Sequence, residues 1–472
     1  MLNATIKLTR ITFFLLLALI TSLASVSQIS PAKLKMKVDS LVNAEMQKQR
    51  IPGLSVVIVR NGIIDYVKGY GYANLEHKVK VKPETIFQAG SVGKQFTAFA
   101  IMLLVEEGRI GLDDPLKKYF PDAPATWEKI TVRHLLNHTG GWASYPDGFN
   151  FQVDYTEDSL YQIISKLPFE FEPGERSRYS NIGYVTLGLL ISKVTGAFYG
   201  EFLKQRIFTP LGMHTASIIS EADIIPNRAA GYRIANDEIK NQRWVSPSIN
   251  TTADGSLYIT ALDMAKWEAA LNAGKLLKRE NYQAMWSPVV LNNGTTYPYG
   301  FGWAIDSING KRIIEHNGSW QGFEAVIKRY PEKKLAVIVL SNLSRSSPNK
   351  ISTRIMELYQ QELIRPKLKA IKDNEPAVTA FIKDFVIRSM EQKLTSDLFT
   401  EELGQQMIKM SAQTAAVLKS KGSFVKLELL DRKAGANDLR LYHYRVVFSK
   451  EELELFISLT KDNKIAHLEG RE

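Results

Sequence analysis

The chain has 472 residues, seven histidines, no cysteine and a formal net charge of +11. This length is sufficient for two or three domains with a sizeable core. The lack of cysteine excludes a disulfide framework and thiolate metal sites. Basic residues are scattered and form no stripe interleaved with aromatic residues, so we expect no nucleic-acid partner, although weak attraction to an anionic cell wall is compatible with the charge.

The first residues have the pattern of an export signal. Lys7 and Arg10 precede an apolar run over 11–23, and small residues follow at Ala24, Ser25 and Ser27. The run has the length of a signal-peptide core and is short for a membrane span. We expect residues 1–27 to be a cleaved signal peptide, with an uncleaved anchor as the alternative. An exported, cysteine-free chain of this size is typical of a bacterial envelope, in the periplasm or secreted.

The N-terminal part predicts one helix and a hairpin. Residues 30–49 form an amphipathic pattern, and Asn61-Gly62 is a strong hairpin signal between the β-rich runs 53–60 and 63–72. Tyr72-Ala73-Asn74 is expected to end this hairpin. A buried helix is then expected to begin at Ser91, and Asp113-Asp114 is interpreted as a turn before Pro115.

The middle of the chain predicts helices and the following part predicts strands. In the segment 130–141, Thr131 resembles an N-cap and Gly140 a helix stop. Further helices are expected at 182–195, ended by Gly196, and at 260–273. Strands are expected at 301–305, 323–329 and 335–340, before a closing helix at 351–363. Strands at both ends and helices between them indicate an α+β fold, with one antiparallel sheet built from the two ends, helices against it and an inserted helical lobe. A cleft between sheet and lobe is a natural place for a site.

A charged, proline-bounded linker is expected at 365–376. Helical patterns at 377–390 and 401–418 then precede β-rich runs at 423–430, 439–448, 454–460 and 465–470. We therefore predict a small C-terminal α+β domain over 377–472, in which no constellation suggests catalysis.

Ser91-Val92-Gly93-Lys94 is the most informative motif. Positions i and i+3 share a helical face, so Lys94 can lie beside the Ser91 hydroxyl. A serine hydroxyl needs a base within hydrogen-bond reach to act as a nucleophile. Gly90 before the motif and an apolar run after it favour a rigid, buried helix start.

Two further motifs supply groups that acyl transfer requires. In Tyr179-Ser180-Asn181, Tyr179 offers a second base or proton shuttle, and Asn181 offers a donor and an acceptor for a substrate amide. His316-Asn317-Gly318-Ser319 precedes a predicted strand. Gly318 permits close approach there, and the Ser319 N–H can pair with the Ser91 N–H as an oxyanion hole.

His316 is expected to orient Tyr179 or the substrate. His138-Thr139-Gly140 is interpreted instead as a helix C-cap with a buried or capping histidine. Trp142 and Tyr145 either line the cleft or pack. No metal or other cofactor is expected.

The order and context of these motifs resemble the serine β-lactamase-related family, which comprises class C β-lactamases, DD-peptidases, esterases and D-amino-acid peptidases. The resemblance extends from about Ser40 to Leu363, within an expected hydrolase domain at 30–364. It implies a β-lactamase/transpeptidase-like sheet with a helical lobe. It also implies that Ser91 is acylated, that Lys94 is its base or base partner, and that Tyr179 assists deacylation. Asn181 would contact the substrate amide, and Ser319 would lend its N–H to the oxyanion hole.

His316 departs from the family pattern, because the antibiotic-hydrolysing members carry lysine at this position. A histidine with a near-normal pKa is mostly neutral at pH 7 and pairs poorly with a substrate carboxylate. An ester or peptide substrate is therefore favoured over a β-lactam.

Three hypotheses follow. The first is an exported serine hydrolase that forms an acyl-enzyme at Ser91 on a small-molecule or peptide substrate: a peptidoglycan-like peptide, a D-amino-acid peptide, an ester or a β-lactam. The second is a penicillin-binding or sensor protein that acylates but scarcely deacylates, with the C-terminal domain as an interaction module. The third is a non-catalytic scaffold. Sequence leaves open whether Lys94 or Tyr179 is the operative base, and it leaves the oligomeric state open.

Overall fold

A computed structural model describes residues 30–142, 144–220, 222–435 and 438–471; the expected signal peptide at 1–27 lies outside them. The chain divides into two compact units, one up to Ile364 and one from Arg365 to Glu472. Within the described ranges, no single helix is long and apolar enough to cross a membrane, whereas one bent pair, Asn181–Thr195 with Tyr199–Phe208, meets the length and hydropathy criteria jointly.

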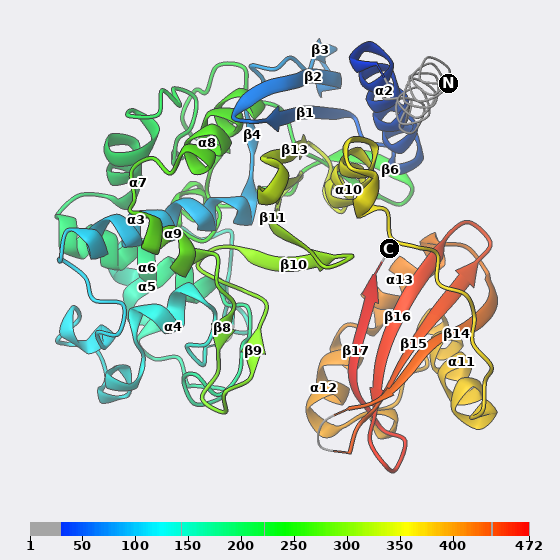
Figure 1. The fold of residues 1–472 in the computed structure, drawn as a ribbon. Coiled ribbons are helices and arrows are strands. Elements are labelled where there is room, and N and C mark those ends of the chain that lie inside the picture. The colour runs from blue at the N-terminus through cyan, green and yellow to red at the C-terminus, as the bar shows by residue number, and fades with distance from the viewer. Residues whose placement is uncertain (1–29, 143, 221, 436–437, 472) are drawn as a thin grey trace, which may run out of the picture. The chain divides into compact units, whose positions relative to one another are not determined.

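The first unit is built on a seven-stranded antiparallel sheet in the order β10-β11-β12-β13-β1-β2-β3. N-terminal strands pair directly with strands from the end of the unit, as the sequence predicted, and Figure 1 shows the blue β1 beside β13. The strand bounds are β1 Gly53–Arg60, β2 Ile63–Asn74, β3 Val79–Lys80, β10 Ala304–Ile308, β11 Lys311–Trp320, β12 Phe323–Tyr330 and β13 Leu335–Ser341.

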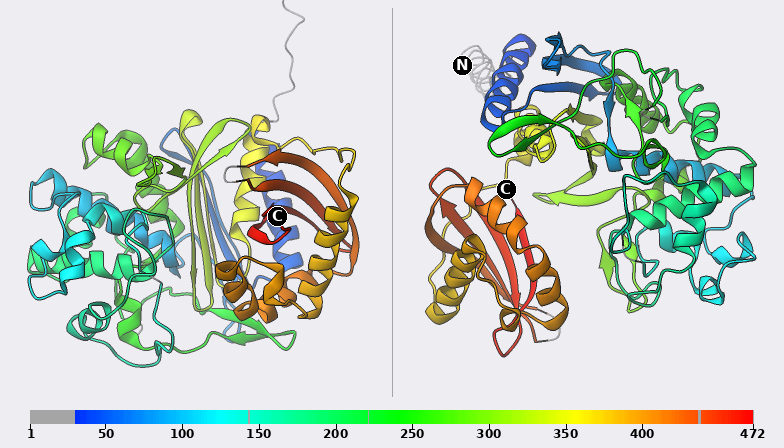
Figure 2. Two further views of the ribbon diagram at one scale, coloured as in Figure 1. Left: turned by 90° about the horizontal axis from the view of Figure 1, so that it is seen from below. Right: turned by 180° about the vertical axis from the view of Figure 1, so that it is seen from behind.

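Helices cover both faces of this sheet, because its central strands are apolar on both sides. Val56 and Ile58 of β1 pack with α2 and α10, whereas Val57 and Val59 face the helical lobe. The left view of Figure 2 shows α2 and α10 on one side of the strands and the cyan and green helices on the other. The helix bounds are α2 Pro31–Gln49, α3 Lys94–Glu106, α4 Val132–Leu136, α5 Glu157–Ile164, α6 Asn181–Thr195, α7 Tyr199–Leu203, α8 Ala261–Ala273, α9 Arg279–Met285 and α10 Pro348–Tyr359.

Short strands complete the first unit, namely β4 Phe87–Gln88 with β7 Tyr258–Ile259, β5 Tyr232–Ala235 with β6 Glu238–Asn241, and β8 Val289–Val290 with β9 Thr296–Tyr297. Several helix limits agree with the sequence patterns. Ser30 caps α2, Thr131 caps α4 and Thr260 caps α8, while Gly196 in the left-handed conformation ends α6.

Two local predictions were wrong and one strand was missed. The helix after Thr131 ends at Leu136 and not near Gly140, because the chain turns through a left-handed His138 (φ 61°). The strand expected at 301–305 begins at Ala304, since Gly302 adopts a positive φ of 74°. The His316 motif precedes β12, as expected, but it also lies inside β11, which was not predicted.

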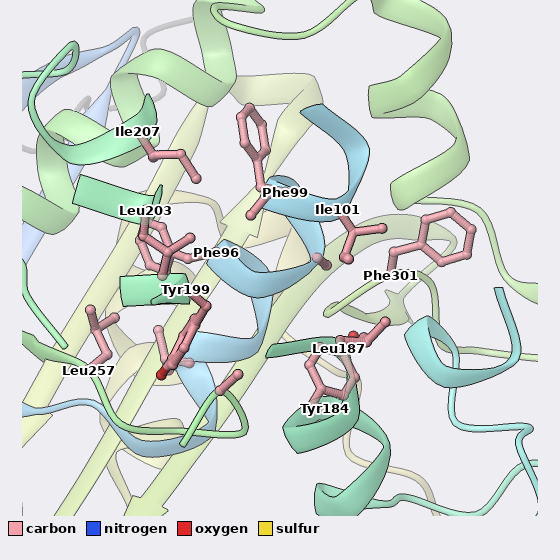
Figure 3. Close-up of a cluster of buried hydrophobic side chains, with 14 of the residues drawn as sticks. Phe96, Phe99, Ile101, Tyr184, Leu187, Tyr199, Leu203, Ile207, Leu257 and Phe301 are labelled. Carbon is pink, nitrogen blue, oxygen red and sulfur yellow. The ribbon is translucent and has the colours of Figure 1, made fainter. Parts of the chain in front are cut away.

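Helix α3 runs through the core of the lobe. Every residue from Lys94 to Leu104 is buried. Figure 3 shows its side chains Phe96 and Phe99 among those of α6, α7 and the segment after Asp254; the labelled neighbours include Tyr184, Tyr199, Leu203 and Leu257. The Phe96 and Trp267 rings are 4.4 Å apart, so α8 also fixes this helix. Burial on all sides makes α3 a rigid support for whatever its first residues carry.

The second unit is a four-stranded antiparallel sheet in the order β14-β15-β16-β17, with its core formed mainly between the sheet and its helices. One predicted helix, 401–418, is two helices. The bounds are α11 Pro376–Glu391, α12 Glu401–Lys409, α13 Ser411–Ser420, β14 Phe424–Ala434, β15 Arg440–Phe448, β16 Glu452–Leu459 and β17 Ile465–Arg471. The α+β class predicted from sequence is therefore present in both units.

The 3-10 turn that precedes α3, η1 (Gly90–Gly93), lies directly against β11. Strand β10 pairs with β11 only as far as Glu315, so the rest of that edge is free to meet the turn. A Cβ on Gly318 would lie 1.9 Å from the Ala89 carbonyl oxygen, and a Cβ on Gly90 would lie 2.7 Å from the Ser319 nitrogen. Both glycines are thus required for this backbone contact.

We expect Gly318→Ala to destabilise the first unit by about 1–3 kcal/mol, the range for overpacking, because the new methyl group collides with backbone that cannot move freely. Urea unfolding monitored by tryptophan fluorescence measures the change. The neighbouring Asn317 is exposed, so Asn317→Ala is the control and should change stability by less than about 0.5 kcal/mol. Equal stability of the two variants would contradict the contact.

Candidate active site

Ser91 and Lys94 stand where η1 passes into α3. Ser91 is partly exposed, whereas Lys94 is completely buried. The Lys94 Nζ donates to the Ser91 Oγ at 3.1 Å and to the Asn181 Oδ1 at 2.7 Å, and it also donates to the backbone carbonyl of Asp254. The serine is therefore reachable from solvent while its amine neighbour is held rigidly in three directions.

The buried ammonium has no carboxylate partner within 4 Å among the described residues. Its surroundings compensate with dipoles and aromatic faces. Nζ lies 4.9 Å from the centre of the Tyr179 ring and 5.4 Å from that of Tyr184. Cation–π contacts of this kind stabilise a desolvated charge without neutralising it.

The N-terminus of α6 delivers Asn181 to this lysine. Ser180 caps the helix through a bond from the Gly183 N–H to its Oγ. The Asn181 Oδ1 accepts a hydrogen bond from the Lys94 Nζ, and the Asn181 Nδ2 donates one to the Ser144 Oγ at 3.1 Å. The amide therefore has a fixed orientation, with its oxygen toward Lys94 and its nitrogen toward the loop after Gly141.

His138 packs against the Tyr179 ring and binds the backbone on both sides of it. The ring of Tyr179 is 41% exposed, and its centre lies 4.2 Å from the His138 ring. The two backbone N–H groups that flank Tyr179 both donate to His138: that of Arg178 to the carbonyl oxygen at 2.9 Å and that of Ser180 to Nδ1 at 3.2 Å. One histidine thus fixes both the backbone and the ring of Tyr179.

His138 was interpreted from sequence as a buried or capping histidine at a helix end, and this is confirmed: it is buried and directly follows the C-cap of α4 with φ 61°. Its contacts with Tyr179 and Ser180 were not predicted. Burial, and secondarily the Lys94 charge, lowers the pKa of His138 well below its ordinary value. The ring is therefore neutral, and its Nδ1 is free to accept the Ser180 N–H.

His316 is also buried and neutral. Nδ1 lies 2.6 Å from the Asn317 carbonyl oxygen, which only accepts, so Nδ1 carries the proton. Nε2 then accepts from the Tyr299 hydroxyl at 2.8 Å. Burial, and secondarily Lys94, lowers the pKa of His316 to about 3. The pKa of His316 is therefore lower than the near-normal value expected from sequence, and the expected neutral ring is present. The polar partner of His316 is Tyr299 and not Tyr179, whose ring centre is 6.3 Å away.

Gly318 and Ser319 lie on the free part of the β11 edge beside η1. Gly318 is buried and Ser319 is exposed, with its Oγ donating to Glu324 on the neighbouring strand at 2.9 Å. Only the backbone of Ser319 therefore remains to face the turn that carries Ser91. All seven residues singled out from the three motifs belong to this one region.

Two residues near the site were missed or left open. The carbonyl of Asp254 binds Lys94, and its carboxylate accepts from the Tyr145 hydroxyl at 3.0 Å. Nothing in the local sequence pattern singles out Asp254, since it lies in a loop between elements. Tyr145 packs against Phe149 and Phe151. Trp142 is 1% exposed and packs against Trp127.

Comparison with known proteins agrees with this geometry. A family model described as Beta-lactamase matches residues 38–360. Penicillin-binding protein 4* of Bacillus subtilis is 29% identical over 382 residues, covering 76% of this chain and 84% of the relative.

Solved structures give the same assignment. The octameric penicillin-binding protein homologue from Pyrococcus abyssi superposes with a TM-score of 0.63 at 26% identity, covering 91% of this chain and 97% of that one. D-amino acid amidase from Ochrobactrum anthropi gives a TM-score of 0.61 at 25% identity, covering 70% and 99%. The predicted β-lactamase/transpeptidase fold is thereby confirmed, and the chain belongs to the β-lactamase family, whose members here include penicillin-binding proteins and an amidase.

Proposed function

We propose that this protein is an exported serine hydrolase that forms an acyl-enzyme at Ser91 on an amide or ester substrate. The observation that carries the proposal is the contact of a fully buried lysine with the Ser91 hydroxyl, 3.1 Å from Nζ to Oγ. Membership of a family of serine acyl-transferases and hydrolases supports it. Export is inferred from the pattern of residues 1–27 alone.

Lys94 is the group that exchanges a proton with Ser91. An ammonium has three N–H bonds, and here the acceptors are Ser91, Asn181 and the Asp254 carbonyl. When Lys94 is neutral, two N–H bonds can stay with Asn181 and Asp254, and the lone pair then points at Ser91. The amine takes the hydroxyl proton as Oγ attacks the substrate carbonyl carbon. The leaving group receives that proton in the next step.

The backbone N–H groups of Ser91 and Ser319 stabilise the oxyanion that forms on the carbonyl oxygen. The close contact of η1 with the free edge of β11 supports this pairing. Such donors act strongly, because they are fixed before the reaction and need no reorganisation. Tyr179, which is partly exposed and lies with its ring against Lys94, takes a proton from the deacylating water as the water attacks the acyl carbon, and that proton is then returned to the departing Ser91 Oγ.

The substrate lacks a carboxylate at the position that residue 316 faces. A neutral His316 offers no charge for an anionic group, so the proposal favours an ester, an amide or a peptide over a β-lactam. Names of relatives include both penicillin-binding proteins and a D-amino acid amidase, which supports a small-molecule or peptide substrate of this kind. Because one structural relative is octameric, an oligomer is compatible with the proposal.

Intact mass spectrometry with a fluorophosphonate and, separately, with benzylpenicillin tests the proposal. We expect a fluorophosphonate adduct on wild type and none on Ser91→Ala, which should also lose at least about a thousandfold in ester or amide turnover while circular dichroism shows the same fold. Undiminished turnover in Ser91→Ala would overturn the proposal.

The penicillin arm separates the second hypothesis from the first. A penicilloyl adduct that lasts for hours would favour a protein that acylates but scarcely deacylates. The penicillin recovered after incubation is also analysed by mass spectrometry for the hydrolysed product, because fast turnover would leave no adduct on the protein. No adduct from either reagent, with no hydrolysis, would favour the non-catalytic scaffold.

His138→Asn tests whether the support beneath Tyr179 matters to catalysis. Asparagine tolerates a positive φ and keeps an acceptor near Nδ1, but it removes the ring under Tyr179. We expect kcat to fall by about 10- to 100-fold, as for a small misplacement of a reacting group, with Ser91 still labelled by the fluorophosphonate.

His134→Asn is the matched control for this prediction. The Nδ1 of His134 also accepts a backbone N–H, from Thr131 at 3.2 Å, but its role is to cap α4. This variant should keep the kcat of wild type. Equal losses in the two variants would mean that both histidines matter only for folding.

The buried neutral state of His316 predicts an acid-labile fold. The unfolded chain binds a proton at this residue below about pH 6.5, whereas the folded chain does so only near pH 3. The contribution of the neutral His316 to the free energy of unfolding is therefore present above about pH 6.5 and is lost as the pH falls below it. From pH 6.5 to pH 5, His316 alone should contribute a loss of about 2 kcal/mol. Urea unfolding at both pH values should show that His316→Gln loses less stability over this interval than wild type. Identical pH dependence of the two proteins would contradict a buried neutral His316.

A further inference from the structure

Glu324 lies directly opposite Ser319 in the sheet. In the register of β11 and β12, Ser319 pairs with Glu324 beside the turn at Gln321 and Gly322. Paired residues of two antiparallel strands project their side chains from the same face of the sheet, so these two side chains can meet. The Ser319 Oγ donates to the Glu324 Oε1 at 2.9 Å. The carboxylate therefore binds the residue whose backbone N–H is proposed to stabilise the oxyanion.

The position of Ser319 depends on this side of the strand, because β11 has a paired neighbour on one side only at this point. Strand β10 pairs with β11 as far as Glu315. On the free side, the backbone of Ser319 is close to the turn η1: a Cβ on Gly90 would lie 2.7 Å from both its nitrogen and its oxygen. Strand β12 and the bond to Glu324 thus determine where the Ser319 N–H lies relative to Ser91.

The loop after β13 holds Glu324 in its turn. The Arg345 N–H donates to the same Glu324 Oε1 at 2.8 Å, and the Gly322 N–H donates to the Ser344 Oγ at 2.8 Å. The loop therefore binds the end of the β11–β12 hairpin at two points. One oxygen that accepts from two donors is an arrangement that favours the ionised carboxylate.

The charge of Glu324 changes near neutral pH. Burial raises its pKa to about 7, while the Arg345 N–H, the Ser319 hydroxyl and the Arg345 charge oppose this rise. Its paired residues are Ser319 on β11 and Ser341 on β13, whose hydroxyls do not titrate in this range, so the charge that acts on it is that of Arg345. Hydrogen bonds to an ionised carboxylate are roughly twice as strong as neutral ones. Glu324 therefore holds Ser319 more strongly above about pH 7 than below it.

We propose that Glu324 is a positioning residue for the oxyanion hole, and that its carboxylate fixes the Ser319 N–H beside Ser91 by binding the Ser319 hydroxyl. This inference rests on the proposed acyl-enzyme at Ser91 and adds a residue that regulates its rate. Glu324 exchanges no proton with the substrate and acts through Ser319. The rate of acylation then follows the charge of a group behind the oxyanion donor.

The second-order rate constant for fluorophosphonate labelling of Ser91 measures this effect without a natural substrate. The phosphonyl oxygen gains negative charge as the serine attacks, so labelling uses the oxyanion hole. Ser319→Ala keeps the backbone N–H and removes the hydroxyl, whereas Glu324→Gln keeps an acceptor and removes the charge. We expect each variant to be labelled about 3- to 10-fold more slowly than wild type at about pH 8.5, part of the effect of losing a hydrogen bond to a charged group.

A double-mutant cycle and the pH dependence separate positioning from a merely structural role. Glu324→Gln should cause little further slowing in a Ser319→Ala background, because the bond is already absent. The ratio of the wild-type rate constant to that of Glu324→Gln should fall toward one at about pH 6, where Glu324 is mostly protonated and resembles glutamine. Both proteins share Lys94 and Tyr179, so the titration of these groups cancels in the ratio.

Glu238→Gln is the matched control. Glu238 is an exposed carboxylate on β6 that forms an ion pair with Lys240. Its removal should leave the rate constant unchanged at both pH values. Complete labelling of each variant after long incubation shows that the variant folds and keeps its nucleophile.

The other outcomes overturn the inference and leave the proposed function separately tested. A wild-type rate constant in Ser319→Ala would mean that the hydroxyl does not position the N–H. Equal slowing by Glu324→Gln with and without the Ser319 hydroxyl would mean that Glu324 acts on another group. A ratio that is the same at both pH values would mean that the charge does not hold Ser319. Failure of wild type to be labelled at Ser91 would instead defeat the proposed function itself.

Discussion

The burial of one ammonium group, that of Lys94, determines how the rest of the site is built. No carboxylate lies within 4 Å of it among the described residues, so neutral oxygens and tyrosine rings must stabilise the charge. Three elements far apart in sequence supply them: α3 itself, the start of α6, and the loop at Asp254. These neutral acceptors leave no formal negative charge beside Ser91. The apolar packing around α3 holds the lysine and its acceptors in fixed positions.

The two buried histidines follow the same logic. A second positive charge near Lys94 would be repelled, and burial already disfavours it, so His138 and His316 are neutral. Neutrality gives each ring one acceptor and one donor nitrogen, and each acceptor is used: His138 receives the Ser180 N–H and His316 the Tyr299 hydroxyl. They position tyrosines and backbone around the lysine without adding charge. Because both histidines are buried in their neutral form, the free energy of unfolding decreases at acidic pH, where the unfolded chain protonates them.

Sequence patterns predicted the parts of the molecule that follow local rules. Alternation, turn residues and caps located β1, β2, β12 and β13, the strands of the second unit and most of the longer helices, but not β11. The residues singled out from the three motifs lie in one region. The patterns failed where tertiary contacts decide. Gly140 looks like a helix stop, yet the chain turns earlier at His138, because its ring is accommodated beneath Tyr179. Asp254 lies in a loop, and only its bond to Lys94 distinguishes it from other aspartates. A contact between segments 160 residues apart leaves no local signal.

Asp254 and Gly255 belong to one segment that contacts both ends of the Ser91–Lys94 motif. The Asp254 carbonyl oxygen accepts from the Lys94 Nζ, and a Cβ on Gly255 would lie 3.2 Å from the Ser91 nitrogen. A shift of this segment would therefore move the serine and the lysine together and preserve the distance between them. Groups whose relative position is fixed in advance need no reorganisation when a reaction begins, which is the form in which a folded scaffold accelerates chemistry.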